Sequence, residues 1–282
     1  MKTSSPASPT TYRPQAEDTS VETDRFEFEL LRKRTAAERA LMSAAIARNV
    51  KQLCLCGLRR RYPNLEDISS AVARAFLGDE CPPNLHFFGS DMTWIQDSLD
   101  LAAMLHPMFE ELTIPYYITG GVASSLHGDP RSTRDLDIVV WLPVETLDLL
   151  VRELEERNFY VPGVEDVRSG RMRTLGITHQ ESISRADFIL ADETEFERVK
   201  FTRRQHIDIP GKGKFWFASA EDVVLNKLRW GLRSQSEKQW RDVLGILKLQ
   251  GETLDFDYLQ HWAIALDLAS ELNRAFSQAQ LP

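Results

Sequence analysis

The sequence predicts an α+β fold in which short strands are combined with amphipathic helices. An apolar, β-branched run at residues 138–142 is typical of a buried strand. A second short apolar segment, residues 115–119, ends at a glycine pair and precedes a helical stretch at residues 122–127. Stretches with helical periodicity also lie before residue 80 and after residue 219. The chain is therefore expected to have a strand-containing core between two helical regions.

The expected organisation has five parts. They are a disordered leader rich in Ser, Thr and Pro (1–18), a helical N-terminal accessory region (19–80), a linker (81–91), the core (92–218) and a C-terminal helical region (219–282). Further helices are predicted at 35–62, 94–111, 147–157, 219–232 and 236–250, with a last helical segment around 259–268, and further strands at 171–180 and 186–190. The glycine–lysine tract at 210–214 lacks the ending of a phosphate loop, so it predicts a hairpin turn between strands 205–209 and 215–218.

Composition narrows the class of protein. The 282 residues include 34 basic and 42 acidic side chains, a net charge of −8, which argues against a general nucleic-acid binder but allows a local basic patch. No apolar run of about 18 residues is present, so no membrane span is expected, and the N-terminus lacks the apolar stretch of a secretory signal. Cys54, Cys56 and Cys81 lack a histidine set with zinc spacing. These features favour a cytoplasmic protein with reduced cysteines.

Two aspartates, Asp135 and Asp137, stand just before the apolar run at 138–142. Residues two apart in a strand point to the same face, so these side chains should project together, roughly 6–7 Å apart along the strand. Two neighbouring carboxylates repel each other unless a cation lies between them. Magnesium takes carboxylate oxygens and keeps waters and substrate phosphates as its other ligands. The pair therefore predicts a metal–nucleotide site.

Gly120 and Gly121, which follow the segment at 115–119, strengthen this prediction. Glycine lets the backbone approach a phosphate closely, and the start of a helix offers unpaired N–H groups. Ser124 and Ser125 would add hydroxyl donors. A glycine pair alone also suits an ordinary strand-to-helix turn, and a lone Asp-x-Asp is common on surfaces. The two motifs at this spacing, each attached to a strand, are more specific.

Gly120-Gly121, a spacer and Asp135-Leu136-Asp137 on a strand resemble the Gly-[Gly/Ser] … Asp-x-Asp motif of the nucleotidyltransferase superfamily that includes DNA polymerase β. Within it, the chain is most similar to bacterial minimal nucleotidyltransferases, including toxins of abortive-infection and toxin–antitoxin systems. A second matching stretch lies at residues 219–230 and continues at Arg241-Asp242. The resemblance covers residues 92–275 and implies a polymerase-β-like core, a mixed sheet flanked by helices.

The resemblance also implies a third carboxylate on an adjacent strand. Asp187 is the candidate because it opens the apolar stretch at 188–190, and it would complete the metal site and help to deprotonate the attacking hydroxyl. Asp192 and Glu193 lie just beyond that strand and suit a solvated turn.

Residues 195–241 are rich in basic side chains, although the chain is acidic overall. By resemblance, Lys227 is expected to contact the nucleotide's phosphates, with Arg229 beside it; a place on the solvated face of a helix is the alternative. Asp242 matches an acidic position in the related proteins, and it could equally orient Lys227 or Arg241 through an ion pair. Arg131 and Arg134 either grip phosphate or neutralise the acidic cluster, and His127 and His179 suit core or surface positions.

The activity that the resemblance implies is transfer of a nucleoside monophosphate from a nucleoside triphosphate to an acceptor hydroxyl. Two magnesium ions would be held by Asp135, Asp137 and Asp187. The acceptor stays open between RNA such as tRNA, a protein, and a small molecule of the aminoglycoside kind, and a toxin–antitoxin role would add a cognate partner protein. A catalytically silent relative that binds a nucleotide or a partner on the same fold is the alternative from a different class.

Overall fold

The structure is a computed structural model that describes residues 12–63, 68–83, 85–234 and 236–281. These residues form two compact units. The sheet unit comprises residues 36–126 and 130–219, and the helical unit comprises residues 12–35, 127–129 and 220–281. Each unit has a hydrophobic cluster of its own.

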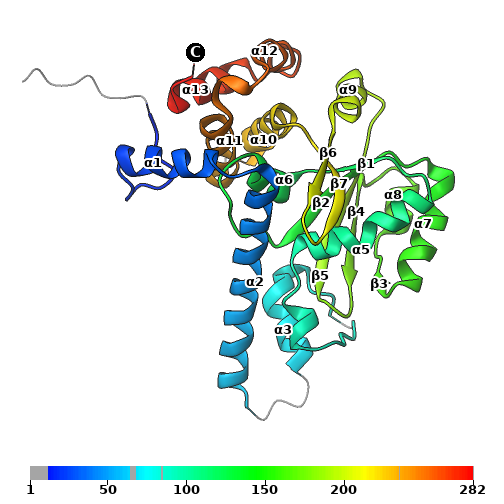
Figure 1. The fold of residues 1–282 in the computed structure, drawn as a ribbon. Helices are drawn as coiled ribbons and strands as arrows, with labels where there is room; N and C mark the ends of the chain where they lie inside the picture. Colours follow the sequence, from blue (N-terminus) through cyan, green and yellow to red (C-terminus); the bar gives the residue numbers. More distant parts are fainter. Residues whose placement is uncertain (1–11, 64–67, 84, 235, 282) are drawn as a thin grey trace, which may run out of the picture. The chain divides into compact units, whose positions relative to one another are not determined.

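The sheet unit is built on a mixed sheet, which confirms the α+β prediction (Figure 1). Among the described residues its seven strands follow the order β3-β4-β5-β2-β1-β7-β6. Their bounds are β1 Tyr116–Ile118, β2 Asp135–Val140, β3 Phe159–Tyr160, β4 Thr174–His179, β5 Ser184–Leu190, β6 Gln205–Ile209 and β7 Gly213–Phe217. β5 runs parallel to β2, and β7 runs parallel to β1. The other neighbouring pairs are antiparallel, including the predicted β6–β7 hairpin.

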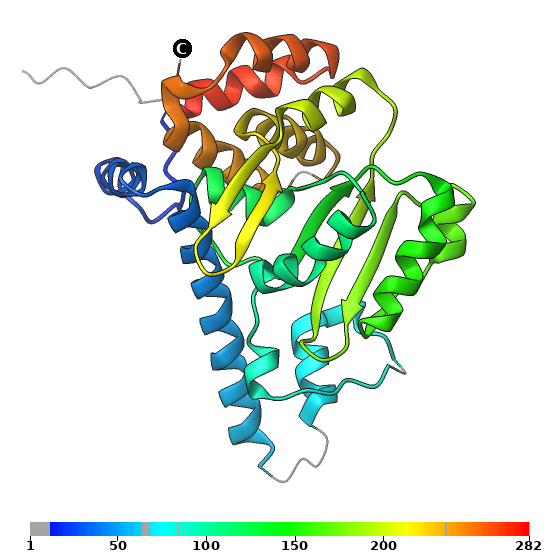
Figure 2. The same cartoon turned by 45° about the vertical axis from the view of Figure 1, so that its right-hand side comes forward.

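Helices surround this sheet. Their bounds are α2 Ala36–Arg61, α3 Ile68–Leu77, α4 Asp91–Trp94, α5 Ser98–Glu111, α6 Gly120–His127, α7 Val144–Glu156, α8 Val164–Arg168 and α9 Glu195–Arg203, with a short 3-10 helix, η1, at Gly78–Glu80. α5 lies across one face of the sheet and contacts β2, β5 and β7 (Figure 2). Its Phe109 ring lies 5.3 Å from the ring of Phe188 on β5. The face that carries Phe188 is therefore the one covered by α5.

The helix predicted at residues 94–111 is divided in the structure. α4 ends at Trp94, and α5 starts only at Ser98. The side chain of Asp97 accepts hydrogen bonds from the backbone N–H groups of Leu99 (2.8 Å) and Asp100 (3.1 Å). An N-cap of this kind satisfies donors at the start of a new helix, so the chain turns at Asp97 instead of continuing the previous helix.

The helical unit contains the first helix and the last four. These are α1 Val21–Arg32, α10 Ala220–Ser234, α11 Glu237–Gln250, α12 Phe256–Ala265 and α13 Ala269–Ala279, with a 3-10 turn, η2, at Gly251–Thr253. As predicted, Ser236 caps α11 by accepting a hydrogen bond from the N–H of Gln239. The predicted last helical segment is two helices, α12 and α13.

The division into units differs from the expected boundaries, because α1 and α2 pack on different partners. In the helical unit, Phe28 of α1 packs in one cluster with Leu249 of α11. A buried ion pair between Lys248 and Asp24, 2.8 Å, joins the same two helices. α2 instead packs on α3 and β6 in the sheet unit. The expected accessory region 19–80 is thus shared between the two units.

Parts of the expected leader and linker are ordered. The hydroxyl of Tyr12 donates to Asp24 at 2.5 Å, and the N–H of Gln15 donates to the same carboxylate at 2.7 Å. Residues 12–18 are therefore tied to α1, whereas residues 1–11 lie outside the described part of the chain. In the expected linker, Phe87 is buried in a hydrophobic cluster of the sheet unit with Val72.

Among the described residues, no helix is both long and apolar enough to cross a membrane. The three cysteines are free thiols. Cys54 lies on α2, as expected, and packs against the hydrophobic cluster of the sheet unit, while Cys56 is exposed on the same helix.

Candidate functional site

The predicted aspartates come together on one face of the sheet. β2 starts at Asp135, earlier than the apolar run indicated, so both Asp135 and Asp137 are strand residues. In the parallel pairing of β2 with β5, Asp137 lies directly beside Asp187, and Asp135 lies beside Arg185. Paired residues on adjacent strands point to the same side, about 4.8 Å apart. We call the side of the sheet that carries Asp135, Asp137 and Asp187 the carboxylate face.

Alternation along the strands places the carboxylate face opposite α5. Leu136 and Ile138 on β2 and Ala186 and Phe188 on β5 are buried, and Phe188 packs against α5. The side chains between them, including Asp137 and Asp187, point the other way and are half-buried. The apolar positions of the two strands therefore fix the side of the sheet to which the three carboxylates point.

Gly120 lies in contact range of Asp137. Its φ is +60°, and a Cβ atom built at this position would lie 1.8 Å from Oδ2 of Asp137. The backbone N–H of Thr119 donates to the carbonyl of Asp137 at 2.9 Å, which holds the turn after β1 against β2. Only glycine fits this close approach, so the β1–α6 turn and the second aspartate form one structural feature.

Gly121 allows a second close approach. A Cβ atom there would lie 2.4 Å from Oγ1 of Thr133, in the segment that leads into β2. The Ser124 hydroxyl donates to the Gly120 carbonyl at 2.7 Å, and Ser125 accepts a hydrogen bond from the N–H of Arg131 at 3.3 Å. Both serines are buried. They were expected to donate to a nucleotide, but in the structure their hydroxyls fasten the turn and the following loop.

Arginines neutralise the carboxylate face. Arg185 donates to Oδ1 of Asp187 from Nη2 at 2.8 Å and from Nε at 3.2 Å, and it also pairs with Glu80 of η1. Nε of Arg134 lies 3.6 Å from Oδ1 of Asp135. Of the two roles that the sequence left open for Arg134, neutralisation of the acidic cluster is the one seen. Among the described residues, no three His, Cys, Asp or Glu side chains are grouped so as to hold a metal ion as they stand.

Gly176 on β4, paired with Asp187, was not identified from the sequence. A Cβ atom at this position would lie 3.0 Å from Nη2 of Arg185 and 3.2 Å from Oδ1 of Asp187. A side chain there would crowd both groups. Gly176 was missed because its role depends on the pairing of β4 with β5, and no residue near it in the sequence indicates that pairing. Arg185 could have been noticed, since it lies two residues before Asp187 and must share its face.

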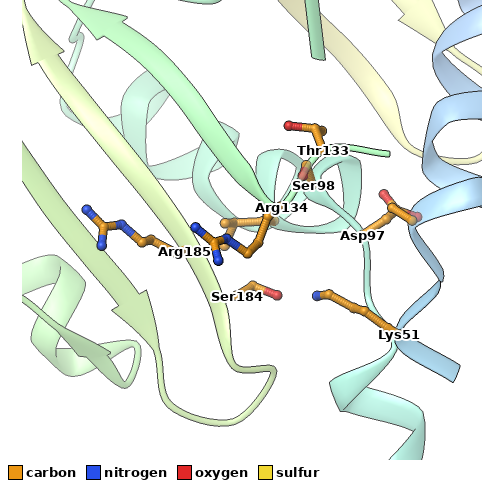
Figure 3. A pocket seen from close by; sticks show the side chains of 9 residues that line it. Lys51, Asp97, Ser98, Thr133, Arg134, Ser184 and Arg185 are labelled. Atoms are coloured by element: carbon orange, nitrogen blue, oxygen red, sulfur yellow. The ribbon is translucent and has the colours of Figure 1, made fainter. Parts of the chain in front are cut away.

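A small pocket adjoins the start of β2 and β5 (Figure 3). It is lined by Ala47, Lys51, Asp97, Ser98, Leu101, Thr133, Arg134, Ser184 and Arg185. The side chain of Lys51 extends from α2 toward Ser184 (Figure 3). The guanidinium groups of Arg134 and Arg185 point away from Lys51. Burial lowers the pKa of Lys51 to about 8, against the opposing effect of nearby carboxylates such as Asp97. Lys51 donates to the carbonyl of Gln96 at 2.6 Å.

The remaining basic candidates lie in the helical unit. Lys227 of α10 is buried, and its Nζ lies 2.8 Å from Oδ2 of Asp242 on α11. The alternative that placed Lys227 on a solvated helix face is therefore wrong, and the ion pair with Asp242 is the one that the sequence suggested. Arg229 is exposed.

The two histidines occupy core positions, which was one of the two expected settings. His127 is buried, and its backbone carbonyl accepts a hydrogen bond from Gln250 at 2.7 Å. His179 is also buried, and its Nδ1 lies 2.9 Å from the hydroxyl of Ser182. Burial lowers the pKa of His179.

Comparisons with known proteins give partial likenesses only. No protein-family model and no curated protein matches the chain. Among solved structures, an antigenic nucleotidyltransferase-like protein from Paracoccidioides brasiliensis shares 20% identity over 69% of this chain and 95% of its own, with a TM-score of 0.43. ANT(2'')-Ia in complex with adenylyl-2''-tobramycin shares 15% identity over 60% and 96%, with a TM-score of 0.44. The lincosamide antibiotic adenylyltransferase LnuA, bound to lincomycin, shares 15% over 53% and 96%, with a TM-score of 0.36.

Likenesses of this size assign no residue and no activity to the present chain.

Gly120→Ala tests the close approach between the β1–α6 turn and Asp137. The added methyl would meet the carboxylate, and the positive φ adds backbone strain, so we expect a loss of unfolding free energy of about 2 kcal/mol or more in urea titrations. Gly170→Ala is the matched control, because Gly170 has a φ of +71° and no atom lies within 4 Å of its Cβ position. The control should cost only about 1 kcal/mol. Equal losses in the two variants would show that Gly120 does not approach Asp137 as described.

Proposed function

We propose that the chain is a nucleotidyltransferase that moves a nucleoside monophosphate from a nucleoside triphosphate to an acceptor hydroxyl. The observation that carries the proposal is the register of β2 and β5, which sets Asp135, Asp137 and Asp187 on one face beside the glycine turn. Oxygen-only donors of this kind suit hard divalent cations. The resemblance in sequence supports the same activity.

Asp135, Asp137 and Asp187 are the residues that would hold magnesium in this proposal. Bound magnesium would neutralise the triphosphate and lower the pKa of the acceptor hydroxyl. The acceptor oxygen attacks the α-phosphorus, the bond to the bridging oxygen breaks, and pyrophosphate leaves. Asp187 takes the proton from the hydroxyl. Most of the rate gain would come from alignment and charge stabilisation, since no protein nucleophile is needed.

The glycine turn would receive the triphosphate. Gly120 and Gly121 begin α6, whose first N–H groups have no partner within the helix and carry the positive end of its dipole. Ser124 and Ser125 contribute by fixing this turn through their hydrogen bonds to backbone atoms. By resemblance, Lys227, which is paired with Asp242, and the exposed Arg229 are further proposed phosphate contacts.

Arg185 has to move for this chemistry to occur. Its guanidinium donates two hydrogen bonds to Oδ1 of Asp187, and a metal ion or a proton bound at that oxygen would displace it. Glu80, which also pairs with Arg185, provides an alternative partner that keeps the charge of the arginine neutralised after it leaves Asp187. A cation at the carboxylate face would take over the neutralising role of the arginine.

The arginine pair also favours a second candidate function. A catalytically silent relative would keep Arg185 on Asp187 permanently and would bind a nucleotide or a partner without turnover. The two candidates differ in a single property, which is whether a divalent cation can displace Arg185.

Asp137→Asn tests the activity itself. Purified protein would be incubated with magnesium and each α-labelled nucleoside triphosphate in turn, with tRNA, bulk protein or an aminoglycoside as acceptor. We expect transfer to one acceptor class, and the variant should lose it by at least about a hundredfold because a charged metal ligand becomes neutral. Asp208→Asn, an exposed carboxylate on β6, should leave the rate unchanged. Transfer by Asp137→Asn at the wild-type rate would contradict the proposal.

Arg185→Ala separates the active candidate from the silent one. If a cation competes with the arginine for Asp187, removing the arginine should tighten manganese binding by roughly two- to fivefold. That factor corresponds to the free energy of a partly exposed ion pair. Binding would be followed by the electron paramagnetic resonance signal of free manganese. Arg171→Ala, which breaks an exposed ion pair with Asp166, is the control. No manganese binding in either the wild type or the variant would favour the silent regulator.

A further inference from the structure

α2 carries an apolar stripe that faces solvent. Met42, Ile46, Val50 and Leu53 expose 39%, 38%, 52% and 73% of their surface, respectively. Spacings of four, four and three residues keep them on one side of a helix. Exposed apolar residues are normal one at a time, but a continuous row along one helix marks an interaction surface.

The core of the sheet unit does not account for this row. α2 already has a packed side, where Ala40, Ala44, Ala47 and Leu55 are buried. In Figure 1, α2 runs as one long helix, with α3 beside its later half. The stripe is thus a second apolar face on a helix whose first face is already buried.

The charges at the two ends of α2 have opposite signs. Glu38 is exposed in the first turn, whereas Arg59, Arg60 and Arg61 are exposed in the last turn. Glu38 lies one helical step before Met42, and Arg60 lies two turns beyond Leu53, so both ends continue the line of the stripe. The helix spans residues 36–61 and the stripe spans residues 42–53, and both are therefore centred near residue 48.

We propose that the stripe, Met42, Ile46, Val50 and Leu53, is the contact surface of a homodimer in which two α2 helices pack antiparallel. If the two-fold axis passes near residue 48, the stripe of one chain packs against the stripe of the other, because the stripe and the helix have the same centre. The same operation brings Glu38 of each chain to the arginine end of the other. Arg59 pairs with Asp91 within the chain, so Arg60 and Arg61 are the arginines at this end of the stripe. A parallel arrangement would place them against their own copies, so the charges select the antiparallel one.

The first test is the mass of the full chain in solution, measured by sedimentation equilibrium over a range of concentrations. We expect a dimer whose dissociation constant rises at least about tenfold in Leu53→Glu and in Ile46→Glu, because each change puts a charge at a buried contact twice. Leu149→Glu is the matched control, since Leu149 is an exposed leucine on α7 of the same unit. The control should dimerise like the wild type, and all four proteins should show the same helical content by circular dichroism.

The second test concerns the charges. Glu38→Arg alone, or Arg60→Glu with Arg61→Glu, should weaken the dimer, and the combination of all three changes should restore it. Failure of the combined variant to recover would show that these ends do not meet.

The third test concerns direction. In a Cys54→Ala, Cys81→Ala background, the two Cys56 residues of an antiparallel dimer lie about 24 Å apart along the axis, too far for a disulfide. Asn49→Cys with Cys56→Ala places the thiols near the two-fold axis, where mild oxidation should crosslink them. A wild type that stays monomeric at all concentrations, a dimer indifferent to Leu53→Glu, or efficient Cys56 crosslinking would each overturn the proposal.

Discussion

The crowding of negative charge on two parallel strands is the constraint on which the rest of the site depends. Asp137 and Asp187 are direct neighbours across β2 and β5, and Asp135 follows on the same side. Neighbouring carboxylates on one face of a sheet repel each other unless cations lie among them. In the structure, Arg185 and Arg134 supply that charge. In the proposed function, metal ions would take over that neutralising role from the arginines.

Two glycines, which lack side chains, are as important for this site as its charged residues. Gly120 lets the β1–α6 turn approach Asp137, and Gly176 leaves room for Asp187 and Arg185 on the adjacent strand. Each glycine faces a different carboxylate. A Cβ atom at Gly120 would clash with Asp137, and one at Gly176 would crowd Asp187 and Arg185. The carboxylate face is therefore enclosed by backbone on the side of β1 and on the side of β4. This enclosure fixes the strands and leaves the side chains as the parts that can rearrange.

Local patterns in the sequence predicted most of the helices and strands, but they did not predict which strands pair with each other. The apolar run after Asp137 and the glycine pair identified β2 and the start of α6, because both signals lie within a few residues. Asp187 lies beside Asp137 because two strands about fifty residues apart in the sequence pair with each other. No local pattern indicates this pairing, so Asp187 was assigned by resemblance alone. The same holds for Gly176 and for the pairing of Arg185 with Glu80. Helix breaks such as the one at Asp97 were missed because the apolar spacing continues through them.

The most direct measurement is a crystal structure of the protein grown with manganese and a non-hydrolysable nucleoside triphosphate, with anomalous diffraction to locate the metal. The account predicts anomalous peaks bound by Asp135, Asp137 and Asp187, with Arg185 turned away from Asp187 and the triphosphate at the N–H groups of Gly120 and Gly121. An intact Arg185–Asp187 ion pair, with no anomalous peak at the carboxylate face, would contradict it.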